Sequence, residues 1–161
     1  MYEDLQPLAN LRIGKVIEQC TQDMERQVVA ANRHLAANGS VLSGEAEMQK
    51  FNIRAGSLET ICRNIARTWL ELIRKRNRTI TRDDVTFVMQ QVEGFALTQA
   101  RSLGSAMVNT PGGPVVRGKF WMDQADTKMR KIAGDIRRDL RDSTTRTRSV
   151  SDAGLNFSHR Q

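Results

Sequence analysis

The sequence predicts an all-α protein: an antiparallel bundle of about four long amphipathic helices, followed by a disordered basic C-terminal tail. Aromatic residues make up only 5% of the 161 residues, which suits helices better than β-strands. Three prolines leave long stretches uninterrupted. Within these stretches apolar residues recur every three or four positions, as they do along the buried face of a helix.

The first helix is expected from about Pro7 to Asn38. Proline suits the first turn of a helix, because its missing N–H would have no partner there. Gly39 can take the left-handed conformation that commonly ends a helix. A continuous apolar stripe predicts one face turned toward a core: Ile13, Val16, Ile17, Cys20, Met24, Val28, Ala31 and Leu35.

A brief helix around Glu45–Phe51 and a long helix of about Leu58–Arg76 are expected next. Gly56 separates the two, and Ser57 can cap the second. One continuous helix through Gly56 is the alternative, at a cost of about 1 kcal/mol relative to alanine, and we prefer the break. The long helix carries an apolar stripe that predicts core packing: Leu58, Ile61, Ile65, Trp69, Leu72 and Ile73.

The third helix is expected to begin at a capping box. The Thr81 hydroxyl can accept from the N–H of Asp84, and the Asp84 carboxylate can accept from the N–H of Thr81. Asp83 and Asp84 also place negative charge at the positive end of the helix dipole. The helix should end near Asn109, after a stripe formed by Val85, Val88, Val92, Phe95, Ala96, Gln99, Leu103 and Met107.

The segment 109–118, with Pro111-Gly112-Gly113-Pro114, interrupts the helices and is either a linker or a binding loop. A fourth helix of about Phe120–Arg141 follows, with a stripe of Met122, Ala125, Met129, Ile132, Ala133, Ile136 and Leu140. After Asp142 the chain is rich in Ser, Thr and Arg and has too few apolar residues to offset its ordering entropy. We therefore expect a helical domain over 1–142 and a disordered tail over 143–161.

The charge of the chain favours anionic partners. The net charge is +7, of which residues 1–110 contribute +2 and residues 111–161 contribute +5. The densest basic stretch is a candidate nucleic-acid-binding cluster, formed by Arg74, Lys75, Arg76, Arg78 and Arg82. The alternative, which we favour, is a solvated joint between two helices, since basic side chains suit the end of a helix.

One local stretch, "IARTWLELIRKRNRTITRDDVTFVMQ", resembles part of a histone fold. It is similar to the end of the long central helix, the second loop and the final helix of that fold. The resemblance covers about 26 of the 161 residues. It implies that Arg78 and Thr79 face DNA phosphate. The first and third helices expected here are longer than those of a histone fold, so the resemblance stays local.

The residues that usually carry catalysis or bind metals are sparse. His34 is expected near the end of the first helix and His159 in the tail, and no cluster of His, Cys, Asp and Glu has metal-ligand spacing. We predict no catalytic residue, metal or cofactor. Cys20 and Cys62 stand far apart and indicate free thiols in a reducing compartment.

The N-terminus and the start of the fourth helix bear on location and partners. The acidic N-terminus lacks the charge pattern of a secretory signal, and no apolar run approaches membrane-spanning length. A cytoplasmic protein without membrane contact is expected. Phe120, Trp121 and Met122 cannot all face one core, so Phe120 and Trp121 are candidate partner contacts.

We expect a non-enzymatic intracellular protein that acts through protein–protein contacts, as an oligomer or as a subunit of a larger assembly. A nucleic-acid-binding protein that uses the 74–82 cluster and the basic C-terminal third is the alternative. A small helical enzyme of unrecognised type is the second alternative. The sequence leaves the identity of the partner and the oligomeric state open.

Overall fold

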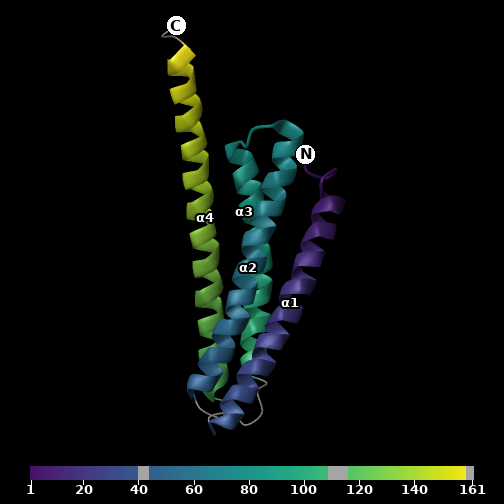
Figure 1. Cartoon of the computed structure of the whole chain (residues 1–161), viewed down its shortest axis with the longest axis vertical. Helices are drawn as coiled ribbons and strands as arrows, with labels where there is room; N and C mark the ends of the chain where they lie inside the picture. The colour runs from purple at the N-terminus through teal and green to yellow at the C-terminus, as the bar shows by residue number, and fades with distance from the viewer. Residues whose placement is uncertain (40–43, 109–115, 159–161) are drawn as a thin grey trace.

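The chain folds into four long helices. The structure, a computed structural model, describes residues 1–39, 44–108 and 116–158, and the side chains of 116–117 and 143–158 lie outside that description. The helices are α1 (Gln6–Ala37), α2 (Gly44–Asn77), α3 (Arg82–Val108) and α4 (Val116–Ser158), and no strand occurs within the described ranges. Successive helices run in opposite directions (Figure 1), so the predicted all-α antiparallel bundle is confirmed.

The end of α1 follows the sequence prediction. Asn38 is the C-cap residue, and its N–H donates to the carbonyl of His34 at 3.2 Å. Gly39 then takes a φ of 68°, and its N–H donates to the carbonyl of Ala36 at 3.2 Å. Glycine adopts this left-handed conformation without the steric penalty of a Cβ, so it ends the helix here.

The predicted break at Gly56 is wrong, because α2 is one continuous helix of 34 residues. Phe51 and Ala55 are both buried and extend the apolar stripe toward the start of the helix. Burying a phenylalanine is worth more than the roughly 1 kcal/mol that a mid-helix glycine costs. Ser57 does not cap a helix; its hydroxyl donates to the carbonyl of Cys20 at 3.1 Å and so joins α2 to α1.

The core lies among α2, α3 and α4. Its largest fully buried side chains come from all three helices: Trp69, Ile73, Cys62, Val88, Val92 and Met129. The stripe predicted for the fourth helix is buried from Ala125 to Leu140. Trp69, at 1% exposure, occupies the core position that its spacing predicted.

Helices α3 and α4 pack closely at Gly104. Ala96, Ala100 and Gly104 recur every fourth residue on the buried face of α3. A Cβ added at Gly104 would lie 2.3 Å from the sulfur of Met122 and 3.1 Å from its Cα. Both distances are shorter than van der Waals contact, so a side chain at this position would force Met122 to shift and this crossing favours glycine.

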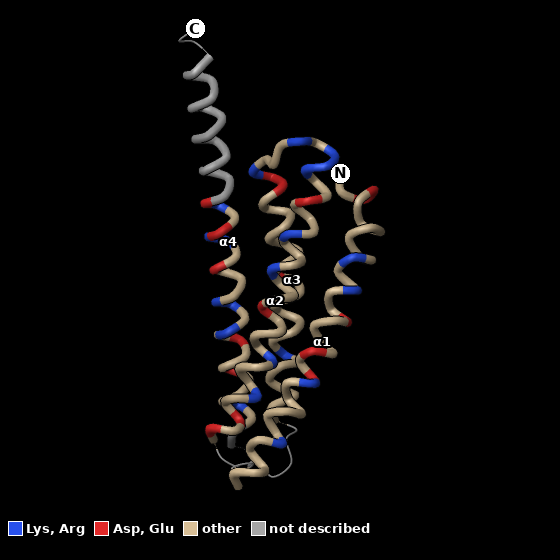
Figure 2. Tube along the Cα trace, viewed as in Figure 1, with Lys and Arg blue, Asp and Glu red and all other residues tan. Residues whose placement is uncertain are grey.

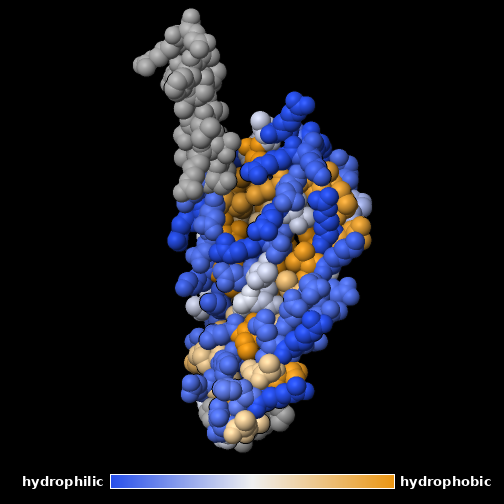
Figure 3. Space-filling view, in the orientation of Figure 1, coloured by the Kyte–Doolittle hydropathy of each residue, from blue (hydrophilic) through white to orange (hydrophobic). Residues whose placement is uncertain are grey.

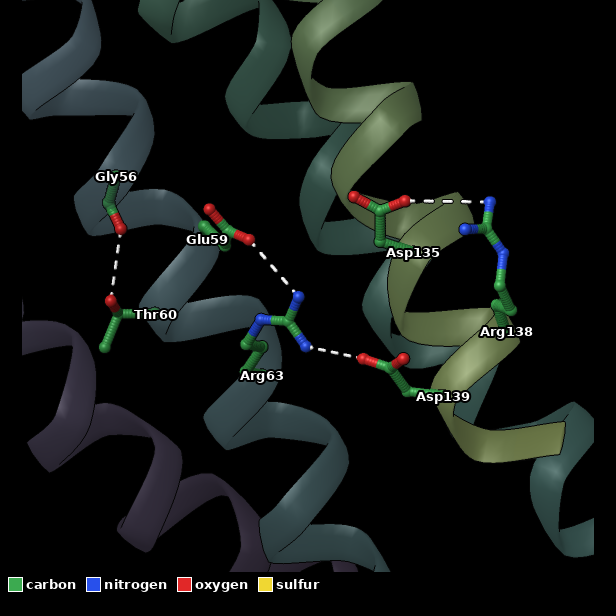
Figure 4. Close-up of polar contacts among 7 residues, drawn as sticks. All are labelled: Gly56, Glu59, Thr60, Arg63, Asp135, Arg138 and Asp139. Carbon is green, nitrogen blue, oxygen red and sulfur yellow. Dashed lines mark hydrogen bonds and ion pairs between the residues drawn. The ribbon is translucent and has the colours of Figure 1, made fainter. Parts of the chain in front are cut away.

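Ion pairs connect the helices outside the core. The Arg63 guanidinium, on α2, lies between Glu59 of the same helix at 3.3 Å and Asp139 of α4 at 2.9 Å (Figure 4). Arg137 of α4 pairs with Glu93 of α3. These pairs are partly solvent-exposed, so each contributes at most about 1 kcal/mol and chiefly fixes the relative position of the helices.

Helix α1 packs against α2 alone. Only Ala9, Ala31 and Leu35 of its 32 residues are buried. Within the described ranges the backbone of α1 comes close to that of α2 alone, and in the upper half of Figure 1 α1 and α4 lie on opposite sides of α2 and α3. The stripe residues from Ile13 to Val28 are therefore only half-buried, because a single neighbour covers one side of a helix.

Two sequence predictions fall on residues that the structure does not fully describe. Helix α4 runs to Ser158, but Asp142 is the last residue with a described side chain. The disordered tail predicted for 143–161, and with it the domain boundary at Asp142, remains a prediction. Residues 109–115 lie outside the described part of the chain. Whether the 109–118 segment is a linker or a binding loop therefore stays open.

Candidate functional site

The turn between α2 and α3 brings together most of the sequence-predicted site residues. After Asn77, Arg78 takes a φ of 62°, and its N–H donates to the carbonyl of Arg74 at 2.8 Å. A left-handed conformation costs a residue with a side chain roughly 1–2 kcal/mol. An arginine thus occupies a position where glycine would be less strained.

Helix α3 begins at the predicted capping box. The N–H of Asp84 donates to the Thr81 hydroxyl at 3.2 Å, and the N–H of Thr81 donates to the Asp84 carboxylate at 2.9 Å. Asp84 is only 3% exposed. Its second carboxylate oxygen accepts a hydrogen bond of 2.6 Å from the hydroxyl of Tyr2.

The environment of Asp84 keeps its carboxylate charged. Burial alone would raise its pKa, but hydrogen bonds from Tyr2 and Thr81, together with the charge of Arg76, bring the pKa below its ordinary value. Burial and the neighbouring Asp84 carboxylate raise the pKa of Tyr2 from 10.0 to about 12, so its hydroxyl remains a donor well into the alkaline range. The buried aspartate is therefore engaged inside the fold.

Residues 1–5 form an N-terminal strap over this turn. The Tyr2 ring stacks on Phe87 with centroids 3.8 Å apart, and Phe87 meets Trp69 edge-on at 4.9 Å. The Arg76 guanidinium lies 5.7 Å from the Tyr2 ring centroid and donates at 2.7 Å both to the Met1 carbonyl and to the Asp4 carboxylate. The strap is the contact that joins the start of α1 to α3.

The strap changes the membership of the predicted basic cluster. Arg76 is engaged with the strap, and this contact could not be predicted from local sequence because its partners lie more than 70 residues away. The other members, Arg74, Lys75, Arg78 and Arg82, are exposed, and none makes an ion pair with the described residues. Figure 2 shows these basic residues gathered at the turn between α2 and α3.

One further basic residue belongs to the same surface. Arg67 is exposed and unpaired among the described residues, and it precedes Arg74 by seven positions, or two helical turns. Arg67 and Arg74 therefore lie on one face of α2, about 10 Å apart along its axis at 1.5 Å per residue, and Arg78 follows in the turn just after Asn77. We call Arg67, Arg74, Lys75, Arg78 and Arg82 the basic ridge. The i,i+7 spacing of Arg67 and Arg74 can be read from the sequence, but only the structure shows that both side chains lie on the exposed face of α2.

The two predicted partner-contact residues have different surroundings. Trp121 is 4% exposed and packs at 5.3 Å from the Phe51 ring, so it belongs to the core. Phe120 is 48% exposed and touches Trp121 edge-on at 5.1 Å. Only Phe120 is thus placed where a partner can reach it.

Helix α1 offers surfaces that sequence patterns did not single out. An open groove of about 760 Å³ lies between α1 and α2, lined among others by Cys20, Met24, Met48 and Ile53. On the outer side of α1, Leu8, Leu11 and Val29 are 42%, 58% and 49% exposed. Figure 3 shows apolar side chains at the surface on the side of the molecule that α1 occupies.

The described residues hold no group of three or more His, Cys, Asp or Glu side chains placed to bind a metal ion. His34 is exposed and contacts the Asn38 amide at 3.2 Å, and His159 lies outside the described part of the chain. Cys20 and Cys62 are free thiols, and burial raises the pKa of Cys62 to about 12. Within the same ranges, no helix is long and apolar enough to cross a membrane.

Comparison with known proteins found no match among protein-family models, curated proteins or solved structures. The local resemblance to a histone fold is not extended by the structure. Helix α1 has 32 residues and α3 has 27, and the long helices pack as an antiparallel bundle. Arg78 and Thr79, which the resemblance places against DNA phosphate, are both exposed.

Proposed function

We propose that this protein is a non-enzymatic assembly protein that acts through protein–protein contacts made by α1. The observation that carries the proposal is the one-sided packing of this helix. A helix in a closed bundle has two or more neighbours, whereas α1 has one and exposes Leu8, Leu11 and Val29. Contact with a partner buries these side chains and gives α1 the second neighbour that it lacks.

The thiols support a cytoplasmic location for this proposed role. Cys20 and Cys62 are both free, and burial raises the pKa of each, which keeps them protonated and unreactive at neutral pH. Free thiols persist in reducing compartments and tend to be oxidised outside them. The proposed assembly therefore forms inside the cell.

Sedimentation of the purified chain tests the proposal. Leu11→Glu places a charge on α1 at a residue that is 58% exposed, and Leu97→Glu makes the same change on α3 at a residue that is 57% exposed. The wild type should associate with rising concentration, Leu11→Glu should shift toward the 18.2 kDa monomer, and Leu97→Glu should behave like the wild type. Equal masses for all three proteins would refute a role for α1.

Nucleic-acid binding by the basic ridge is the second candidate function, and two observations favour it. Five basic side chains gather around one turn and none of them makes an ion pair with the described residues, whereas Arg63 and Arg137 pair with acids of neighbouring helices. Arg78 also retains a strained backbone conformation at the apex of the turn. Strain of this kind concentrates at functional sites.

The ridge suits a phosphate backbone better than a protein surface or a single strand. It has no apolar member, whereas a protein interface has an apolar centre. The neighbouring aromatic rings of Tyr2, Phe87 and Trp69 pack on one another and leave no stacking platform for unpaired bases. Sequence-independent contact with duplex DNA or RNA is therefore the expected mode.

Fluorescence anisotropy with a labelled DNA duplex tests this second function. Four phosphate contacts predict a slope of log K against log salt of about −4, or roughly 100-fold weaker binding between 50 and 200 mM salt. Replacing Arg67, Arg74, Lys75 and Arg78 by glutamine should abolish most of this binding. A control with the same change in charge, on α3 and α4, should bind like the wild type: Arg101, Lys119, Lys128 and Lys131, each replaced by glutamine.

Arg78→Gly separates binding from folding at the ridge. Glycine relieves the left-handed strain, so this variant should be more stable by about 1 kcal/mol and yet bind DNA more weakly. Equal binding by the ridge variant and its control would contradict the second function. Tighter binding of a single strand than of the duplex would contradict the expected mode.

A further inference from the structure

One exposed row along α1 has the spacing of a coiled-coil seam. Its members alternate three and four positions apart, which is a repeat of 3.5 residues. We call them the α1 row: Leu8, Leu11, Lys15, Glu18, Gln22, Glu25 and Val29, all of which are exposed. Two strongly apolar ends thus flank a charged and polar middle.

The α1 row lies on the side of the helix away from α2. Ile13 and Cys20, which pack toward the core that α2 contributes to, are two residues from the nearest row members and so lie about half a helical turn away from them, at 3.6 residues per turn. A second helix can therefore pack along the row without displacing α2. Among the described helices none occupies this side of α1.

The row is complementary to itself when two copies run antiparallel. With a two-fold axis beside residue 20, Leu11 faces Val29 of the second copy, and Lys15 faces Glu25. Glu18 faces Gln22, which accepts or donates a hydrogen bond without adding charge. The two-fold symmetry makes each of these contacts twice.

A parallel pair would bring like charges together. Lys15 would face Lys15, Glu18 would face Glu18 and Glu25 would face Glu25, so three layers of the seam would be repulsive. The antiparallel arrangement replaces two of these repulsions with two Lys15–Glu25 attractions. The charge pattern therefore selects the orientation as well as the partner.

A surface hollow lies where the antiparallel arrangement needs one. It has a volume of about 460 Å³ and is lined by Gln22, Glu25, Arg26, Val29, Ala30 and Arg33. Leu11 of the second copy falls opposite Val29, within this hollow. A coiled-coil side chain inserts into such a space between residues of the facing helix.

We propose that two copies of this chain associate through an antiparallel pairing of their α1 rows, with Lys15 of each copy against Glu25 of the other. This inference rests on the proposed function, to which it adds the identity and the register of the partner. One flanking contact opposes it, because Arg12 approaches Arg26 of the second copy. Asp23, 3.7 Å from Arg26, offsets part of that repulsion.

Charge reversal tests the register. Lys15→Glu and Glu25→Lys should each raise the dissociation constant at least about tenfold, because either change creates two like-charged contacts; tenfold corresponds to about 1.4 kcal/mol. The doubly reversed chain should return to within about threefold of the wild type, since the pair is restored with its signs exchanged. Lys131→Glu, a reversal at an exposed residue of α4, serves as the control and should associate normally.

Mixing the two single variants gives an independent readout. An equimolar mixture should associate more tightly than either variant alone, because residue 15 of one chain then faces residue 25 of the other with opposite charge. Oxidative cross-linking fixes the direction. Leu11→Cys combined with Val29→Cys should yield a covalent dimer, and Leu11→Cys alone should give none through that position.

The outcomes separate this inference from the proposed function. If Leu11→Glu dissociates the assembly but the doubly reversed chain stays weak, the register is wrong and assembly through α1 stands. Efficient cross-linking through Leu11→Cys alone would show a parallel pair and overturn the inference. If neither Leu11→Glu nor charge reversal changes the mass, the inference and the proposed function both fail. Circular dichroism of each variant verifies that the helices remain folded.

Discussion

Replacing Gly104 by alanine should loosen the packing of α3 on α4. The added Cβ would lie 2.3 Å from the sulfur of Met122, which can rotate away, but also 3.1 Å from the Cα of Met122, which cannot move without shifting α4. Forcing one extra carbon into a packed interior costs roughly 1–3 kcal/mol. Alanine recovers about 0.5–1 kcal/mol through its better helix propensity. The expected net loss in the free energy of unfolding is therefore about 0–2.5 kcal/mol, with a midpoint near 1 kcal/mol.

Gly94→Ala on the same helix provides the matched control. A Cβ at Gly94 meets no atom within 4 Å, so only the propensity gain of about 0.5–1 kcal/mol applies and the variant should be more stable. Urea unfolding followed by circular dichroism measures both changes. In thermal unfolding Gly104→Ala should melt about 2–4 °C below the wild type for a net loss near 1 kcal/mol. If both variants gain stability equally, the close approach of α3 to α4 does not exist as described.

Three further changes test other parts of the fold. Thr81→Ala removes the cap of α3 and should cost about 0.5–2 kcal/mol in urea unfolding; an unchanged midpoint would show that the cap contributes nothing. Ile132→Asp, at a residue that is 2% exposed, should cost several kcal/mol or unfold the chain, whereas Lys128→Ala should stay within about 0.5 kcal/mol. Because the pKa of Asp84 is lowered in the fold, its contribution to stability is complete above the ordinary aspartate pKa of about 3.9 and is lost as the pH falls further. Tyr2→Phe removes one cause of that lowering, so acid unfolding should begin at a higher pH, and identical acid transitions would contradict the Tyr2–Asp84 contact.

Features set by neighbouring residues could be predicted from the sequence. The capping box joins Thr81 and Asp84 across three positions, and both of its hydrogen bonds are present. The stripe of α4 needed only the helical repeat. The continuity of α2 through Gly56 was missed because a local glycine penalty competes with burial of Phe51, which depends on where Trp121 lies in the fold.

Features that depend on distant residues escaped prediction. The strap joins Tyr2 to Asp84 across 82 positions, and the sequence around neither residue predicts the contact. Local sequence also places Arg76 with the other basic residues of the 74–82 stretch, although its partners are at the N-terminus. The one-sided packing of α1 is likewise a property of the assembled bundle, since its stripe alone resembles that of a helix with a full set of neighbours.

The N-terminal strap also sets an order of events during synthesis. Tyr2 emerges from the ribosome before its partners Asp84 and Phe87, which follow 82 and 85 residues later. At about 5–20 residues per second, this interval lasts roughly 4–17 s. Helix α1 can pack against α2 during that time, but the strap contacts at its start cannot form until the beginning of α3 has been synthesised. The growing chain therefore presents the outer side of α1 to its surroundings well before the N-terminus is locked in place.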